Sequence, residues 1–214
     1  MAETAPMSGR RAQAARNDLL ILESAKAVFL ADPGAPITAV AKHAGVGISA
    51  LYSRYASKDD LLRTLCTEGL QRVIAETQRA LADDRDSWTT FEDYMRRCVE
   101  ADTSSMTLAL AGTFTPTPDM FTLAEQANQL AQALFTKVKD VLRPGVDVHD
   151  VSLIFEVVAA VKTSDQQRTQ RLRRRYLAVI LDGLRATERG SLPGPPPTWQ
   201  DVSERWMPAS GPAG

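Results

Sequence analysis

Residues 38–55 read TAVAKHAGVGISALYSRY, two short helical patterns on either side of a glycine turn. The patterns cover residues 38–44 and 48–55. Gly45 stands where the chain must turn sharply, and glycine adopts the positive φ of such a turn without strain. We therefore predict a helix-turn-helix whose second helix is free to enter the major groove of DNA. Four apolar residues would hold the two helices at their crossing angle: Val40, Ala41, Val46 and Leu51.

Both helices are too short to be stable alone, so they must pack on neighbouring helices. Upstream, Asn17 fits the N-cap of a helix over Asp18–Ala31, which places several apolar residues on one face. Downstream, Ser57 fits the N-cap of a long helix that runs to about Ala82. We expect this long helix to be the shaft between two domains.

The stretch from Ala44 to Leu62 resembles the signature of the TetR family of transcriptional regulators. That signature commonly runs Ala-Gly-Val-Ser-x-Gly-Thr-Leu-Tyr-x-His-Phe-x-x-Lys-x-x-Leu, and this chain reads AGVGISALYSRYASKDDLL. The Gly-Val-Gly-Ile start of the second helix resembles a known variant of the motif. The chain departs from the common signature at five positions: Gly47, Ser49, Ala50, Arg54 and Tyr55.

The resemblance implies an all-α fold, with an N-terminal three-helix helix-turn-helix domain and a C-terminal helical domain for ligand binding and dimerisation. It also implies a homodimer that binds double-stranded operator DNA and is released by a small hydrophobic ligand, with no cofactor. An alternative is a ligand-binding protein of the same fold whose DNA binding is lost or altered. An enzyme is disfavoured, because neither His43 nor His149 has acid-base or metal-ligand spacing around it.

Carried over position by position, the resemblance assigns phosphate contacts to Tyr52 and Lys58. Arg54 could reach a phosphate or a guanine, and Thr38 would cap its helix and touch the DNA backbone. The blander alternatives are that Tyr52 and Tyr55 belong partly to the core and that Lys42 is merely solvated. The full set of candidate DNA contacts is Thr38, Lys42, Gly47, Ile48, Ser49, Tyr52, Ser53, Arg54 and Lys58.

Charge is distributed unevenly along a chain whose net charge is only −1. Residues 1–58 carry seven basic against four acidic side chains, whereas residues 59–104 carry six basic against eleven acidic ones. This pattern favours DNA affinity confined to the N-terminal module. Cys66 and Cys98 are too few for a disulfide framework, so we expect two buried thiols. No apolar run approaches the ~20 residues of a membrane span, and we expect a cytoplasmic protein.

The rest of the chain predicts further helices over 88–101, 106–114, 119–142, 148–163 and 166–186, with Asp147 as an N-cap. The domain boundaries expected from these patterns are a flexible basic arm at 1–16, the DNA-binding domain at 17–62, the ligand-binding and dimerisation domain at 63–186, and a Pro/Gly-rich tail at 187–214. In the tail, Trp199, Val202 and Trp206 would share one face of a short helix that docks on the body of the protein.

The last two long helices are predicted to form the dimer interface. Eight of the nine residues from Leu153 to Val161 are apolar, so this helix needs cover on both sides. Arg173, Arg174 and Arg175 are interpreted as a solvated face or as partners for acids across the dimer, rather than as a second nucleic-acid surface. The expected interface residues are Leu153, Phe155, Val157, Val161, Leu172, Tyr176, Val179 and Ile180.

A ligand cavity between the shaft and the dimer helices is implied by the family and not by spacing. Large adaptable side chains in these segments could line it, although each one singly fits an ordinary core. Arg97, Thr103 and Thr113 are candidates for polar contacts, and Pro116 with Pro118 for a rim. The candidate lining residues are Phe91, Tyr94, Met95, Cys98, Met106, Leu110, Phe114, Met120, Phe121, Leu123 and Phe135.

Overall fold

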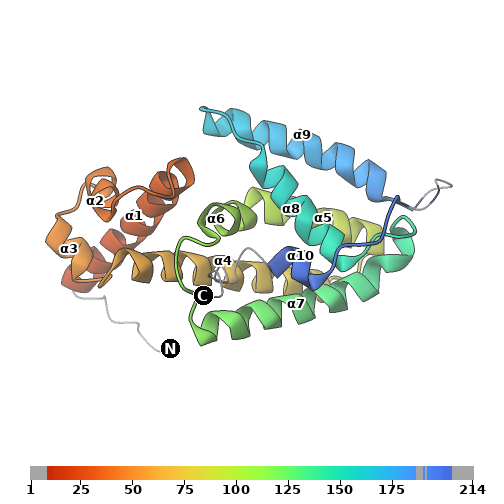
Figure 1. The fold of residues 1–214 in the computed structure, drawn as a ribbon, viewed down its shortest axis with the longest axis horizontal. Coiled ribbons are helices and arrows are strands. Elements are labelled where there is room, and N and C mark those ends of the chain that lie inside the picture. The colour runs from red at the N-terminus through yellow and green to blue at the C-terminus, as the bar shows by residue number, and fades with distance from the viewer. Residues whose placement is uncertain (1–8, 187–189, 191, 204–214) are drawn as a thin grey trace, which may run out of the picture. The chain divides into compact units, whose positions relative to one another are not determined.

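The structure is a computed structural model that describes residues 9–186, 190 and 192–203 of the chain (Figure 1). Every regular element in these residues is a helix, as predicted, and the β-type pairing they contain is an isolated bridge between Leu142 and Arg185. The chain folds into two compact units, with the boundary between Leu65 and Cys66. No helix in the described residues is long and apolar enough to cross a membrane.

The first unit contains α1 (Gly9–Ala31), α2 (Ile37–Ala44), α3 (Ile48–Tyr52) and the start of α4 (Lys58–Leu81). Helix α2 packs against α1, which supplies the neighbour that these short helices need. Burial of apolar side chains from all four helices stabilises the unit. Its fully buried large side chains are Ile21, Phe29, Val40, Leu51, Leu61, Leu62 and Leu65.

Helix α1 begins at Gly9, so residues 9–16, which the sequence analysis assigned to a flexible arm, are helical. Asn17 lies inside the helix, and the prediction that it caps the N-terminus is wrong. The physical reason is that RRAQAAR contains only good helix formers and no residue that stops a helix. Residues 1–8 lie outside the described residues.

The turn at Gly45 has the predicted conformation. Gly45 has φ 66° and ψ 26°, the left-handed region, and caps the C-terminus of α2. The Gly45 N–H donates to the Lys42 carbonyl at 3.3 Å, and the Val46 N–H donates to the Ala41 carbonyl at 3.1 Å. These bonds satisfy the last carbonyls of α2 while the chain reverses.

Two helix ends in this unit differ from the prediction. Pro36, not Thr38, occupies the N-cap of α2, because proline fits the start of a helix and has no N–H to satisfy. Helix α3 ends at Tyr52 instead of Tyr55. The N–H groups of Arg54 and Tyr55 both donate to the Leu51 carbonyl at 3.0 Å, and the Arg54 bond spans three residues, which tightens the chain into a 3₁₀-type turn after α3.

The second unit contains the rest of α4 and the helices α5 (Ser87–Glu100), α6 (Thr103–Leu110), α7 (Pro118–Val138), α8 (Val148–Ala160), α9 (Gln166–Leu184) and α10 (Trp199–Ser203), with a short 3₁₀ turn η1 (Lys139–Val141) after α7. Asp147 caps α8, as predicted, by accepting from the His149 N–H at 3.0 Å. The core of this unit is a cluster that includes Phe91, Met95, Val138 and Leu177.

Several helices in the second unit are shorter or shifted relative to the prediction. Helix α6 covers 103–110 instead of 106–114, and α7 gives way to η1 after Val138. Helices α8 and α9 end at Ala160 and Leu184. At the end of α8, the Arg173 guanidinium donates to the carbonyls of Ala159 and Val161 at 2.6 and 3.0 Å. These bonds take the place of those that backbone N–H groups would make if the helix continued for another turn.

Candidate functional site

The exposed surface of α2 and α3 carries the candidate DNA contacts. The structure exposes eight of the nine candidates: Thr38, Lys42, Gly47, Ile48, Ser49, Tyr52, Ser53 and Arg54. The ninth, Lys58, is half-buried. On α3, the apolar side of the helix points inward through Leu51, which is fully buried. The opposite side is therefore available to a duplex.

Two large side chains on α3 are exposed to solvent, although burying their apolar surface would stabilise the folded chain. Tyr52 is 49 % exposed and Ile48 is 37 % exposed. Tyr55, three residues after Tyr52, is only 8 % exposed and belongs to the core, as predicted. Tyr52 is therefore accessible from solvent, whereas Tyr55 packs in the core.

Arg54 and Lys58 already have partners within the first unit. The Arg54 guanidinium makes a two-pronged ion pair with the Asp18 carboxylate of α1. The Lys58 ammonium donates to the Pro33 carbonyl at 3.0 Å and lies 5.1 Å from the centre of the Phe29 ring. Both cations hold the helix-turn-helix to α1, and a DNA phosphate would have to compete with these contacts or share them.

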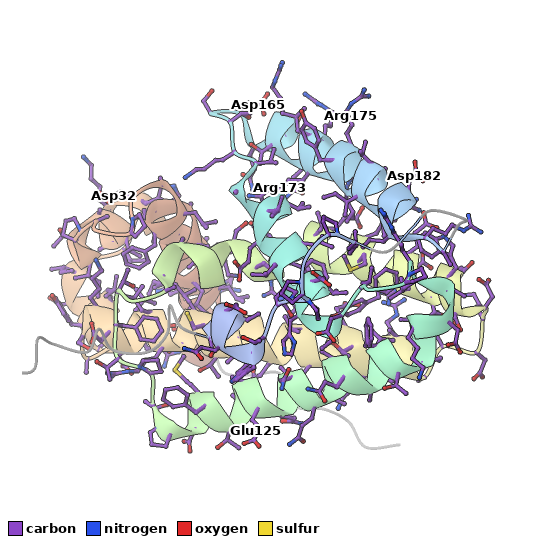
Figure 2. The ribbon with its side chains drawn as sticks, turned by 45° about the vertical axis from the view of Figure 1, so that its right-hand side comes forward. Asp32, Glu125, Asp165, Arg173, Arg175 and Asp182 are labelled. Carbon is purple, nitrogen blue, oxygen red and sulfur yellow. The ribbon has the colours of Figure 1, made fainter. Side chains whose placement is uncertain are left out.

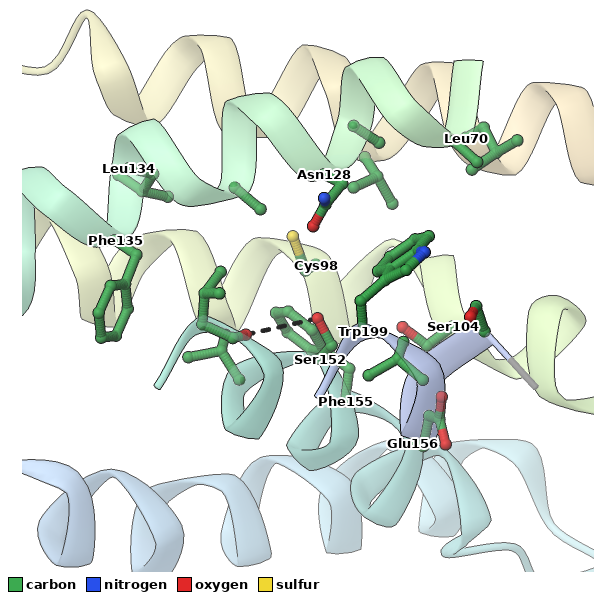
Figure 3. A pocket seen from close by; sticks show the side chains of 18 of the residues that line it. Leu70, Cys98, Ser104, Asn128, Leu134, Phe135, Ser152, Phe155, Glu156 and Trp199 are labelled. Carbon is green, nitrogen blue, oxygen red and sulfur yellow. Dashed lines mark hydrogen bonds between the residues drawn. The ribbon is translucent and has the colours of Figure 1, made fainter. Parts of the chain in front are cut away.

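The second unit contains a cavity of about 270 Å³ that is partly open to solvent. Helices α4, α5, α7, α8 and α10 supply most of its wall (Figure 3). The wall is predominantly apolar. It includes six aromatic side chains, Phe91, Tyr94, Phe121, Phe135, Phe155 and Trp199, the last of which belongs to α10. Such a cavity suits a small apolar molecule with few polar groups.

The structure brings six of the eleven candidate lining residues to the cavity wall: Phe91, Tyr94, Cys98, Met120, Phe121 and Phe135. The other five, Met95, Met106, Leu110, Phe114 and Leu123, do not line it. Met95 and Leu110 are completely buried and pack in the core instead. Phe91, Tyr94 and Cys98 belong to the same core cluster as Met95 and also border the cavity, so the cavity lies against the core.

Small residues on α7 make the space for the cavity, and sequence reasoning missed them. Ala124, Ala127, Asn128 and Ala131 line the cavity together with Met120. They recur at intervals of three and four residues, the spacing of one helix face. That stripe of small side chains was the sequence signal available, because small residues leave room that large residues would fill.

Further lining residues were also missed. They come from α4, α6, α7, α8 and α10, and they include the polar side chains of Ser104, Ser152 and Glu156. The complete set of additional residues is Cys66, Leu70, Val73, Ser104, Leu134, Val138, Val148, Val151, Ser152, Phe155, Glu156, Trp199, Val202 and Ser203.

Both cysteines lie on the cavity wall as buried thiols outside any disulfide, as predicted for their burial. Burial raises the pKa of the Cys66 thiol and of the Cys98 thiol to about 12 each. Burial also raises the pKa of Tyr94, whose hydroxyl lies 3.4 Å from the Thr77 hydroxyl. These three groups are neutral at physiological pH, so they present polar atoms without charge to a ligand.

Arg97 and Thr113, two of the remaining polar candidates, do not line the cavity. Arg97 donates to Glu76 at 2.7 Å, and Thr113 donates to the Leu110 carbonyl at 2.8 Å. The Thr103 side chain lies outside the described residues. Of the proline pair, Pro116 lines the cavity and Pro118 opens α7.

Helices α8 and α9 leave an apolar face uncovered within one chain. Val157 is 61 %, Tyr176 50 % and Val179 63 % exposed. The other interface candidates Leu153, Val161, Leu172 and Ile180 are half-buried. Phe155 differs from them, because its ring lines the cavity and meets the Tyr94 ring edge-on at 5.9 Å between centroids.

The three arginines on α9 do not form one solvated face. Arg173 is 5 % exposed and lies where α8 and α9 meet, while Arg175 points away from the helices (Figure 2). Arg174 pairs with Glu100 at 3.1 Å. The interpretation of Arg173 as a surface residue is wrong, because Asp102 and two carbonyl groups compensate for its burial.

Comparisons with known proteins identify the fold. No family model matches the chain, and no curated protein matches it in sequence. The TetR family transcriptional regulator PfmR from Thermus thermophilus is 20 % identical, with a TM-score of 0.58 over 81 % of this chain and 97 % of that chain. LfrR from Mycobacterium smegmatis, a TetR-like regulator solved in complex with proflavine, is 17 % identical, with a TM-score of 0.58 over 83 % and 99 %.

A TetR transcription regulatory protein from Mycobacterium vanbaalenii is 24 % identical, with a TM-score of 0.51 over 82 % of this chain and 98 % of that chain. These likenesses span both units of the chain and nearly the full length of each solved structure. At these identities they establish the fold, which is that of TetR-type transcriptional regulators.

Proposed function

We propose that this chain is a DNA-binding transcriptional regulator, a repressor that acts as a homodimer and leaves its operator when a small apolar molecule occupies the cavity. The single observation that carries the proposal is the exposed face of α3. It follows a left-handed glycine turn at Gly45 and presents Ile48, Ser49, Tyr52 and Ser53 to solvent. This is the geometry with which a helix-turn-helix reads a major groove.

The chemistry of that face fits a duplex. Tyr52 and Lys42 can contact phosphates, which position a protein on DNA. Ile48, Ser49 and Ser53 present a mixture of apolar and hydroxyl groups, and such groups read thymine methyls and base edges. The exposed fraction of Tyr52, 49 %, would fall on contact with DNA.

The uncovered face of α8 and α9 supports a dimer. A two-fold interface pairs the same patch on both subunits, and Val157, Tyr176 and Val179 give this patch the apolar, aromatic character of an interface core. Two recognition helices on a two-fold dimer would reach half-sites about one helical turn apart, roughly 35 Å, so we expect a palindromic operator.

The cavity supports control by a ligand, since a largely apolar wall around about 270 Å³ is suited to a small hydrophobic molecule. Helix α4 supplies Cys66, Leu70 and Val73 to the cavity wall, and the same helix begins at Lys58 beside the helix-turn-helix. A ligand that binds better to the conformation with low DNA affinity would shift the population toward release.

A band-shift experiment with DNA from the promoter of the chain's own gene tests the proposal. We expect sequence-selective binding that weakens by about a hundredfold or more when salt rises from roughly 50 to 200 mM. Tyr52→Ala should lower the affinity by about tenfold, through the loss of a hydrogen bond to a charged group. Lys42→Ala should weaken binding to all DNA sequences and flatten the salt dependence.

The matched control is Lys139→Ala, which removes an exposed positive charge from the second unit. Its DNA affinity should equal that of the unmodified chain. If the purified dimer shows no selective binding to its own or neighbouring promoters, the regulator proposal fails, and a ligand-binding protein of this fold remains.

A further inference from the structure

Helix α10 forms part of the cavity wall although it comes from the end of the chain. Trp199, Val202 and Ser203 line the cavity beside residues of α7 and α8. Figure 3 shows the Trp199 indole reaching from α10 into the space between α7 and α8. The sequence predicted that this segment docks on the body, and the contacts between α10 and α8 confirm that prediction for the described residues.

The segment before α10 is fixed to the body of the second unit. After α9, the Ala186 N–H donates to the Val141 carbonyl at 2.9 Å, and the Arg143 N–H donates to the Leu184 carbonyl at 2.7 Å. The Arg143 side chain donates to the Gly190 carbonyl at 2.8 Å. Residues 193–197 read PGPPP, a semi-rigid spacer that restricts where the following helix can lie.

Helix α10 has its own N-terminal cap. The Asp201 carboxylate accepts from the Thr198 N–H and the Thr198 hydroxyl, both at 2.7 Å. These bonds hold the pKa of Asp201 below its ordinary value, so the cap is ionised and intact at neutral pH. The Trp199 ring also lies 6.3 Å from the His149 ring of α8, measured between centroids. The cap therefore fixes the start of α10, and the His149 ring is an aromatic neighbour of the indole on α8.

Trp199 nevertheless remains 46 % exposed, although it takes part in the wall of an apolar cavity. A large aromatic surface left uncovered at such a place is a surface that a bound molecule can cover. Other rings line the same cavity, among them Phe91, Tyr94 and Phe155. A flat aromatic molecule can stack on the indole while its edges meet these rings.

We propose that Trp199 is a ligand-contact residue, and that α10 selects flat aromatic molecules over aliphatic molecules of similar size. The inference depends on the proposed function only in taking the cavity as a ligand site. Its test uses probe binding alone, so that a failure of DNA binding and a failure of this inference are separate results.

The experiment measures binding of the neutral fluorescent probe N-phenyl-1-naphthylamine to the full-length chain. Trp199→Ala should raise the dissociation constant about tenfold, because the stacked surface and its burial are both lost. Trp199→Phe should recover most of the affinity, since it keeps a ring. Gln200→Ala is the matched control, because Gln200 lies next to Trp199 on α10, is exposed and does not line the cavity.

Two further measurements separate a contact with the ligand from a structural effect. Displacement of the probe by 1-decanol reports aliphatic binding, and Trp199→Ala should change the decanol affinity by less than about threefold. The probe should also quench part of the tryptophan emission of the unmodified chain by energy transfer, and Trp199→Phe should remove that part. If Trp199→Ala does not fold, judged by circular dichroism, Val202→Asn provides the second variant and should weaken probe binding severalfold.

Three results would overturn the inference. The first is an unmodified chain that binds no probe at micromolar concentrations. The second is a Trp199→Ala variant that binds the probe as tightly as Gln200→Ala does. The third is tighter binding by Trp199→Ala than by the unmodified chain, because α10 would then block the cavity rather than contact its ligand.

Discussion

The guanidinium of Arg173 on α9 lies 2.7 Å from the carboxylate of Asp102, one of the two residues that join α5 to α6. Asp102 adopts a φ of 51°, which non-glycine residues rarely do. The same guanidinium donates to two carbonyls at the end of α8. One buried side chain thus connects the ends of three structural segments.

Replacement of Arg173 by leucine should destabilise the chain strongly. The change leaves the Asp102 carboxylate and two carbonyl groups without their donor, and loss of one partner of a buried pair costs about 3 kcal/mol. Urea unfolding of Arg173→Leu should show this loss. Arg175→Leu is the control, because Arg175 is exposed on the same helix, and its unfolding free energy should change by less than about 0.5 kcal/mol. Equal effects of the two substitutions would contradict the structural role of Arg173.

Gly45 and Gly47 allow strain and DNA contact to be tested separately. Neither position has an atom within 4 Å of an added Cβ, so neither substitution causes a clash. Gly45→Ala should still cost about 1 kcal/mol, because Gly45 has φ +66°. Gly47 has φ −65°, so Gly47→Ala should leave thermal stability unchanged or slightly raised. A Gly45→Ala variant as stable as the unmodified chain would contradict the left-handed turn.

Gly47→Ala then serves as a test of the proposed DNA surface. Gly47 is exposed beside Ile48, where an added methyl group would stand between α3 and a duplex. We expect the band-shift affinity to fall severalfold while the melting temperature stays constant. Unchanged affinity would place Gly47 outside the interface.

Val179→Arg should convert a dimer into a monomer. Val179 is 63 % exposed in one chain. Because a two-fold interface contains the same residue from each subunit, the substitution would bury two arginine charges in the dimer, and burying an unpaired charge is costly. Light scattering coupled to size exclusion should show the halved mass, and DNA affinity should fall with it. The control is Leu19→Arg on α1, which is 66 % exposed and should leave the mass unchanged. A Val179→Arg chain that keeps the mass of a dimer would move the interface elsewhere.

The fold of the first unit could be predicted from the sequence because the information is local. A glycine at the end of a short apolar pattern determines the turn at Gly45, and Leu51 and Tyr55 turn inward as their spacing indicates. Helix ends were less predictable. The end of α8 depends on Arg173, and the compensation for burying Arg173 comes from Asp102, 71 residues away in the chain. No local pattern contains that pairing.

The cavity was only half predictable for a similar reason. Large apolar side chains were the natural candidates, yet Met95 and Leu110 are fully buried without lining the cavity, whereas Phe91 and Tyr94 belong to the core and also line the cavity. Which role a side chain takes depends on the helix opposite. The cavity exists where rings of α5 and α8 face the small residues of α7, and only the assembled structure shows that they face each other.

The small residues of α7 therefore give a direct test of the cavity. Ala131 lines it, and Ala131→Leu adds three carbon atoms to the space that a ligand would occupy. Because an empty apolar space accepts such atoms readily, the melting temperature should stay within a few degrees of the original value or rise. The affinity for N-phenyl-1-naphthylamine should fall by about tenfold or more, since the probe and the leucine compete for one volume.

Ala133→Leu is the matched control, two residues away on the exposed side of α7. It adds the same atoms outside the cavity and should bind the probe as the unmodified chain does. If both variants bind the probe equally well, the probe occupies another site, and the ligand cavity assigned to this unit is wrong.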